Sequence, residues 1–266
     1  MLIAALAGLS TASCLSTRSA LEPLPPGGHH VLFVGNSLTY TNDLPATVAA
    51  IAASAGDTIR VAMEVGADLA LIDHLTGSTQ AVQHIAQGGW EYVVLQQGPT
   101  PAGICRDSLV LWTKMFDARI RAVNAKTAVL MVWPIVGVGP PFDDVRTSFQ
   151  MATQAVDGTF LPAGEAWRSA FRADSTVALY SSDGFHPSPL GTFLTALVIY
   201  ERVTGHDPRS LQPLAFSNGQ QFSVPAATIR LLQTAAHEAN TTFPASPGVP
   251  YVPTANPSAP SYGNHC

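Results

Sequence analysis

The sequence has few charged side chains, few basic ones in particular, and little cysteine. Only 12% of its 266 residues are charged, and 13 lysines and arginines stand against 18 acidic residues, for a net charge of -5. This balance leaves no basic surface of the kind that binds nucleic acid, so we expect no nucleic-acid partner. No stretch reaches the roughly 18 consecutive apolar residues of a membrane span. The length fits one α/β domain better than two.

An apolar run, MLIAALAGLSTAS, opens the chain and ends in small residues before Cys14. It is typical of the hydrophobic part of a signal peptide, although a basic stretch before it is missing. Its end resembles a bacterial lipoprotein signal, which implies a lipidated Cys14 and attachment to a membrane, although Thr11 departs from the aliphatic residue usual there. We therefore predict an exported protein that is periplasmic, extracellular or anchored to the cell envelope. Export would place Cys105 and Cys266 in an oxidising compartment, where they can pair.

Proline, glycine and serine divide the chain into segments. We expect a signal at residues 1–14, a linker at 15–30, one domain at 31–243 and a Pro/Ser-rich tail at 244–266. Within the domain, short apolar segments predict strands at 31–34, 58–63, 92–95, 127–133 and 159–161. Segments of helical periodicity alternate with them, at 44–55, 69–85, 108–123, 143–156, 164–171, 190–203 and 225–239. This order predicts a three-layer α/β/α sandwich around a central five-stranded parallel sheet, as in flavodoxin-like folds.

Ser37 is the first candidate for a nucleophile. It follows the buried strand at 31–34 in the turn Gly35-Asn36-Ser37, and the carboxyl edge of a parallel sheet is where open α/β folds place their ligands. Backbone N–H groups after such a turn can point at a developing oxyanion. Serine and asparagine are also common turn and cap residues, so partners elsewhere in the chain have to support this interpretation.

Asp183 and His186 provide those partners. They lie three residues apart on one short loop, and Gly184 gives its backbone freedom. A histidine that activates a serine needs an acceptor on its other ring nitrogen, and this spacing can supply one. In a doubly wound sheet with the first strand at its centre, this loop and the loops after strands one and three meet at one edge.

Four motifs resemble those of the SGNH hydrolase superfamily, also called GDSL-type esterases. They are VGNSLTYTNDLP, VGADL, VVLQQGPTP and SDGFHPSPLG, in the order of that family and spread over residues 31–191. The resemblance implies Ser37 as nucleophile, His186 as base and Asp183 as the residue that orients it. It also implies an oxyanion hole that contains the backbone N–H groups of Ser37 and Gly66.

The third motif departs from the family pattern, because it lacks Gly-x-Asn-Asp. It is similar to relatives among carbohydrate acetylesterases that carry Gln-Gly. On that pattern Gln97 supplies the side-chain donor of the oxyanion hole, with Gln96 and Thr100 as alternatives. The first motif reads GNS rather than GDS, which leaves the mechanism unchanged.

The function that follows is a serine esterase that acts on a small-molecule or carbohydrate ester, with short acyl or O-acetyl groups favoured. Acyl transfer of this kind requires no metal or organic cofactor. The main alternative is an inactive carbohydrate-binding protein on the same fold, since a fold does not fix its chemistry. A flavin-binding, flavodoxin-like protein is a weaker one, because it leaves Asp183 and His186 unexplained. Four aromatic side chains are candidates to line a pocket, although core packing is more usual: Trp133, Phe142, Trp167 and Phe185.

Overall fold

A computed structural model describes residues 27–253 of the chain. The predicted signal with Cys14, most of the predicted linker and the end of the tail with Cys266 lie outside the described residues. Cys105 is disulfide-bonded, and its pairing with Cys266 remains a prediction. None of the described helices is both long and apolar enough to span a bilayer.

Five parallel strands form the central sheet in the order β2-β1-β3-β4-β5. Their bounds are His29–Gly35 (β1), Ile59–Val65 (β2), Tyr92–Gln96 (β3), Lys126–Leu130 (β4) and Thr159–Leu161 (β5). Apolar runs such as Val31 to Val34 are fully buried because helices cover both faces of the sheet. We expected the first strand at the centre of the sheet. The central strand is instead β3, and β1 lies next to it.

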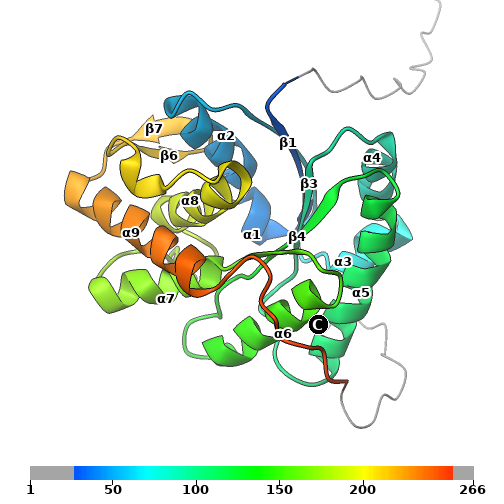
Figure 1. Cartoon of the computed structure of the whole chain (residues 1–266). Coiled ribbons are helices and arrows are strands. Elements are labelled where there is room, and N and C mark those ends of the chain that lie inside the picture. Colours follow the sequence, from blue (N-terminus) through cyan, green and yellow to red (C-terminus); the bar gives the residue numbers. More distant parts are fainter. Residues whose placement is uncertain (1–26, 254–266) are drawn as a thin grey trace, which may run out of the picture.

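Helices form the two outer layers of the sandwich. Figure 1 shows α1, α2, α7, α8 and α9 on one side of the sheet and α3 to α6 on the other. The first group comprises Ser37–Tyr40 (α1), Leu44–Ser54 (α2), Ala163–Ala173 (α7), Pro189–Thr204 (α8) and Ala226–Thr242 (α9). The second comprises Leu71–Thr76 (α3), Ala81–Gln87 (α4), Ile104–Arg121 (α5) and Phe142–Gln154 (α6). The predicted three-layer fold is thus confirmed.

The main differences from the expected elements are local. The strand expected over 127–133 ends at Leu130, because its partner β5 ends at Leu161, opposite Leu130. The segment expected to be irregular over 207–224 contains a short 3-10 helix, Pro208–Ser210, and a hairpin of β6 (Ala215–Ser217) and β7 (Gln220–Phe222). The loop with Asp183 and His186 follows α7 rather than a strand of the sheet.

Candidate active site

Ser37 lies at the first position of α1, directly after β1. Asn36 caps this short helix, since its side-chain oxygen accepts the Leu38 N–H at 3.1 Å. The Asn36 amide group donates to the Leu69 carbonyl oxygen at 3.1 Å, which binds the loop after β2 to the turn. Ser37 is only 7% exposed. The turn therefore presents a serine that is held by backbone and side-chain contacts on both sides.

His186 joins Ser37 to Asp183 through its two ring nitrogens. Nε2 lies 2.9 Å from Ser37 Oγ, and Nδ1 lies 2.6 Å from Asp183 Oδ2. A carboxylate can only accept, so Nδ1–H donates to Asp183 and Nε2 is left to accept the Ser37 hydroxyl proton. The three side chains that we expected to meet at one edge of the sheet do so.

Hydrogen bonds keep the Asp183 carboxylate ionised. The bond from His186, together with the N–H groups of Phe185 and His186, lowers the pKa of Asp183 to about 2. Those two N–H groups donate to Oδ1 at 2.9 and 3.0 Å, so Oδ2 stays directed at the imidazole. Both side chains remain accessible, with 50% of Asp183 and 32% of His186 exposed. This is an open site at a sheet edge.

Contacts from the end of β4 hold the loop of His186 in place. Trp133 donates its ring N–H to the Phe185 carbonyl oxygen at 2.9 Å, and the Tyr180 hydroxyl donates to the Pro134 carbonyl oxygen at 2.7 Å. The loop after Pro134 also contacts it, because the Val136 N–H donates to the Gly184 carbonyl oxygen at 3.0 Å. The base therefore rests on a well-connected loop.

Asn42 connects the turn that follows Ser37 to the loop that contains His186. Its side-chain amide donates to the Pro187 carbonyl oxygen at 2.9 Å and to the Thr192 hydroxyl oxygen at 3.0 Å. Its backbone is left-handed, with φ of 55°, a conformation that asparagine tolerates better than most residues. Asn42 thus links the turn after α1 to the residue that follows His186.

The predicted oxyanion residues come from β2 and β3. Gly66 directly follows β2. Because Val65 pairs with Gly35 in the sheet, Gly66 lies beside the turn that contains Ser37. Gln97 follows β3, is 3% exposed, and accepts the Leu71 N–H on its side-chain oxygen at 2.8 Å. The alternative Thr100 donates its hydroxyl to the Gly98 carbonyl oxygen at 3.0 Å. The roles of these residues remain predictions.

The four aromatic candidates divide into two pairs. Trp133 and Trp167 are buried and stacked, with ring centroids 3.6 Å apart, so they belong to the core. Phe142 and Phe185 are half-buried, and the Phe185 ring lies edge-on to His186 at 5.1 Å. Only Phe185 of the four has a ring contact with a residue of the candidate site.

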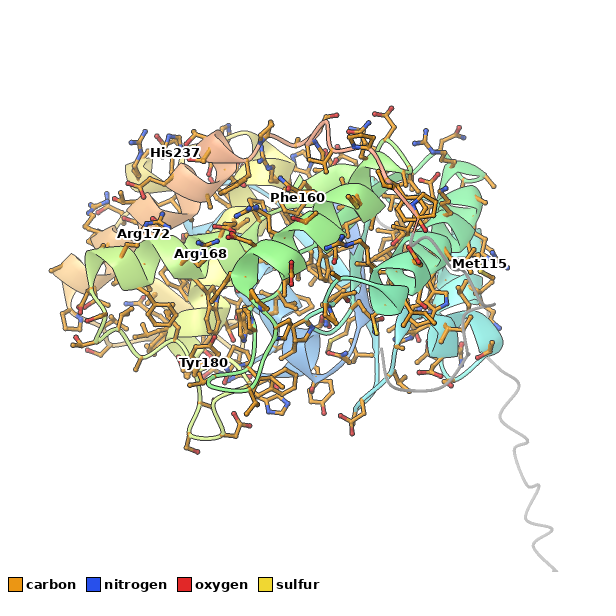
Figure 2. The ribbon with its side chains drawn as sticks, turned by 90° about the horizontal axis from the view of Figure 1, so that it is seen from below. Met115, Phe160, Arg168, Arg172, Tyr180 and His237 are labelled. Carbon is orange, nitrogen blue, oxygen red and sulfur yellow. The ribbon has the colours of Figure 1, made fainter. Side chains whose placement is uncertain are left out.

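A second group of charged side chains gathers along α7 and α9. Arg168 and Arg172 lie along α7 beside α9 (Figure 2), where buried Glu165 pairs with Arg146 and Arg168 at 3.0 and 3.1 Å. A cavity of about 280 Å³ opens there, lined in part by these arginines. Within residues 27–253, the three potential metal ligands that come together are Glu201, Asp207 and His237, near the C-terminal end of α8.

Sequence reasoning missed the supporting residues. Three residues contact the Ser37 turn or the His186 loop without having been predicted to do so: Gln96, His74 and Asn42. Asn42-Asp43 did carry a signal, because two successive turn-forming residues before Leu44-Pro45 are typical of a tight turn and a helix cap. His74 carried none, since a lone histidine in an apolar segment gives no indication of its partner.

Comparisons with known proteins find solved structures of similar fold. The chain is similar to a DUF4886 family protein from Bacteroides uniformis, with a TM-score of 0.65 and 17% identity over 80% of this chain and 95% of that one. It is similar to a candidate SGNH hydrolase from Slackia heliotrinireducens, with a TM-score of 0.55 and 26% identity over 66% of this chain and 99% of that one. An acetyl xylan esterase variant from Geobacillus stearothermophilus gives a TM-score of 0.50 and 13% identity over 66% and 95%. No protein-family model matches the sequence, and neither does any curated protein.

The fold and the site define an α/β/α protein with a serine, a histidine and a carboxylate in series at one edge of a parallel sheet. Within this class, the chain has the fold of SGNH/GDSL hydrolases, as its similarity to the candidate SGNH hydrolase shows. The fold that the resemblance to this superfamily implied is confirmed, whereas the assignment to a Gln-Gly variant stays a prediction.

Proposed function

We propose that the protein is a serine esterase in which Ser37 is the nucleophile, His186 the general base and Asp183 the residue that orients the imidazole. The observation that carries this proposal is the unbroken series of contacts, 2.9 Å from Ser37 Oγ to His186 Nε2 and 2.6 Å from His186 Nδ1 to Asp183 Oδ2. A serine is nucleophilic at neutral pH when a base within hydrogen-bond distance takes its proton and a third group holds that base.

The reaction runs in two halves. Ser37 Oγ attacks the carbonyl carbon of the ester while its proton moves to His186 Nε2, and the Asp183 carboxylate stabilises the imidazolium. The imidazolium then gives that proton to the departing alcohol, which leaves an acyl group on Ser37. In the second half, a water molecule attacks the carbonyl carbon of the acyl group and gives a proton to His186 Nε2. The bond to Ser37 Oγ then breaks, His186 returns the proton to Ser37 Oγ, and the acid is released.

The developing oxyanion requires donors on the opposite side of the carbonyl. We assign these to the backbone N–H groups of Ser37 and Gly66 and to the side-chain amide of Gln97. Because the Gln97 oxygen accepts the Leu71 N–H at 2.8 Å, the nitrogen is the end of this amide that is directed elsewhere. Donors of this kind, fixed before the reaction begins, are often the largest single contribution to catalysis.

The substrates that we favour are esters of short acyl groups, and O-acetyl groups on carbohydrate are the first to test. The open site supports a bulky alcohol portion, because half of the Asp183 side chain and a third of His186 are exposed. We also propose export by the signal at residues 1–14, with Cys14 as a lipid anchor. The disulfide of Cys105 supports an oxidising compartment.

The deciding experiment compares wild type and Ser37→Ala on a short-chain aryl ester. We expect Ser37→Ala to lose at least about a thousandfold in kcat, since removal of a triad member typically leaves only a small residual rate. Ser54→Ala is the matched control, because Ser54 lies at the exposed end of α2 and its hydroxyl donates within that helix, to the Ile51 carbonyl oxygen. Hydrolysis by Ser37→Ala at the wild-type rate would disprove the proposal. Binding of acetylated glycans by a wild type that cleaves no ester would favour the carbohydrate-binding alternative.

A further inference from the structure

Gln96 is the last residue of the middle strand β3 and lies beneath the Ser37 turn. Its side chain is 1% exposed. The side-chain oxygen accepts two hydrogen bonds, from the Asn36 backbone N–H at 2.9 Å and from the Thr39 hydroxyl at 2.8 Å. These donors stand on either side of Ser37 in the sequence. One oxygen therefore binds the turn both before and after the candidate nucleophile.

The missing side chain of Gly35 makes this contact possible. A Cβ atom at Gly35 would lie 2.5 Å from the Gln96 side-chain oxygen and 2.6 Å from the Thr39 hydroxyl oxygen. Real Cβ atoms do not approach other atoms so closely, so any larger residue would displace Gln96 or Thr39. The conformational freedom of glycine is not the reason here, since the backbone of Gly35 is part of β1. Gly35 is required because the Gln96 side-chain oxygen occupies the space that a Cβ atom at this position would fill.

The other end of the Gln96 amide has no hydrogen-bond partner in the described part of the chain. This end is the side-chain nitrogen, and it is buried. A buried amide that leaves one end unsatisfied costs stability. The side-chain hydrogen bonds of Gln96 are the two that its oxygen accepts, and both come from the turn that contains Ser37.

We propose that Gln96 is a positioning residue for the nucleophile, which goes beyond the roles assigned above and rests on the proposed esterase function. It acts through Asn36 and Thr39 and not on the substrate itself. By fixing the Asn36 peptide and the first turn of α1, its oxygen sets the direction of the Ser37 backbone N–H and of Ser37 Oγ. This assigns Gln96 a role other than the oxyanion donor that the sequence left open for it.

Loss of the Gln96 oxygen leaves the Asn36 N–H and the Thr39 hydroxyl as buried donors without an acceptor. The turn is then expected to shift until these groups find other partners. A displacement of about 1 Å at a reacting group costs on the order of a hundredfold in rate. The consequence should fall on kcat, because the substrate still binds while the attacking atom is misplaced.

The first test is Gln96→Met, which keeps an unbranched side chain of similar length and removes the acceptor. With a short-chain aryl ester we expect kcat to fall by about 30- to 100-fold while KM stays within about twofold. The rate at which an aryl phosphonate ester phosphonylates Ser37 should fall by a similar factor, since that reaction uses the same Ser37 Oγ and N–H. A folded Gln96→Met variant with wild-type kcat and phosphonylation rate would overturn the proposal.

Thr39 provides a second pair of variants that does not alter β3. Thr39→Val removes one of the two bonds to the Gln96 oxygen, and we expect kcat to fall about 3- to 10-fold, while Thr39→Ser should restore it. Thr153→Val is the control, because Thr153 also loses a buried hydroxyl bond, to the Phe149 carbonyl oxygen at 2.7 Å, within α6 and outside this turn. If Gln96→Met fails to fold, equal kcat for Thr39→Val, Thr39→Ser and Thr153→Val would overturn the proposal.

Ser37→Ala separates this inference from the proposed function. If Ser37→Ala retains full activity, the esterase mechanism itself is wrong. If Ser37→Ala is inactive while Gln96→Met and Thr39→Val keep wild-type kcat, the mechanism stands and only the role of Gln96 is lost.

Discussion

At the residue scale, two neighbouring glutamines bind different parts of the same site. The Gln96 oxygen accepts from Asn36 and Thr39 in the Ser37 turn, whereas the Gln97 oxygen accepts the first N–H of α3, from Leu71. Gln96 is the last residue of β3 and Gln97 is the first residue after it, and their side chains contact different segments of the chain. The sequence pattern Gln-Gln-Gly does not show which glutamine has which role, because the roles depend on the hydrogen-bond partners that the fold brings to each side chain.

Gln97 gives a prediction about the oxyanion hole. Gln97→Ala should lower kcat about a hundredfold or more with little change in KM, because one oxyanion donor typically contributes about 3 kcal/mol. Gln97→Glu is the sharper variant, since a carboxylate can still accept the Leu71 N–H but has no N–H to donate. Steady-state kinetics on a short-chain aryl ester measures both. Wild-type kcat in Gln97→Glu would transfer the donor role to a neighbour, with Thr100 as the first to test.

At the scale of elements, the sequence predicts the layers well because buried strands and amphipathic helices leave periodic apolar patterns. The strand expected over 159–161 has the observed bounds, and the helix expected over 44–55 ends one residue early. The β6–β7 hairpin was missed because three-residue strands are too short for periodicity. Its turn, Asn218-Gly219, has positive φ at both residues and is a strong hairpin signal that was available.

The candidate site was predictable only where one short motif carries the geometry. Asp183 and His186 lie on one loop, so their spacing alone predicts their contact. Ser37 and His186 are 149 positions apart, and their meeting follows from sheet topology combined with a family resemblance. Contacts such as Asn42 to Pro187 depend on how two loops pack after the fold has formed. No local pattern in the sequence encodes such a packing.

Asn42 gives a prediction at this scale, because it joins the turn before α2 to the loop before α8. Asn42→Gly keeps the backbone at φ of 55° but removes two hydrogen bonds, so we expect a loss of about 1–2 kcal/mol in the free energy of unfolding and a several-fold lower kcat. Asn42→Ala should lose about 1 kcal/mol more, because alanine disfavours a left-handed backbone. Urea denaturation and steady-state kinetics measure these effects.

Asn124→Gly is the matched control for Asn42. Asn124 also has a left-handed backbone, with φ of 60°, but it is exposed in the turn between α5 and β4, at the opposite end of the strands. We expect this variant to keep wild-type kcat and to lose no stability. If Asn42→Gly behaves like Asn124→Gly, the link between the two loops contributes nothing.

At the scale of the whole molecule, one histidine connects the helical layer to the sheet next to the site. His74 in α3 is fully buried, and its Nε2–H donates to the Gly35 carbonyl oxygen at 3.0 Å. Nδ1 lies 2.8 Å from the Thr79 hydroxyl, which can donate to it when the ring is neutral. Burial lowers the pKa of His74 below its ordinary value of 6.5. The folded protein therefore holds this ring uncharged.

This burial predicts a loss of stability in mild acid. In the unfolded chain His74 takes up a proton near pH 6.5, whereas the folded state resists it, so the unfolded state binds more protons below that pH. Stability from His74 is thus complete above about pH 6.5 and falls as the pH decreases toward the lower folded pKa. The contribution of Asp183 is separate, since its pKa of about 2 places its loss below pH 4.

The measurement is the thermal midpoint of wild type and His74→Gln between pH 7.5 and 5. Glutamine can still donate to the Gly35 carbonyl oxygen but does not titrate, so its midpoint should depend less on pH over this range even if it is lower throughout. For a chain of this size each kcal/mol lost corresponds to about 2–4 °C. Parallel curves for the two proteins would show that the charge on His74 does not limit the acid stability of the fold, and that the loss comes from other groups.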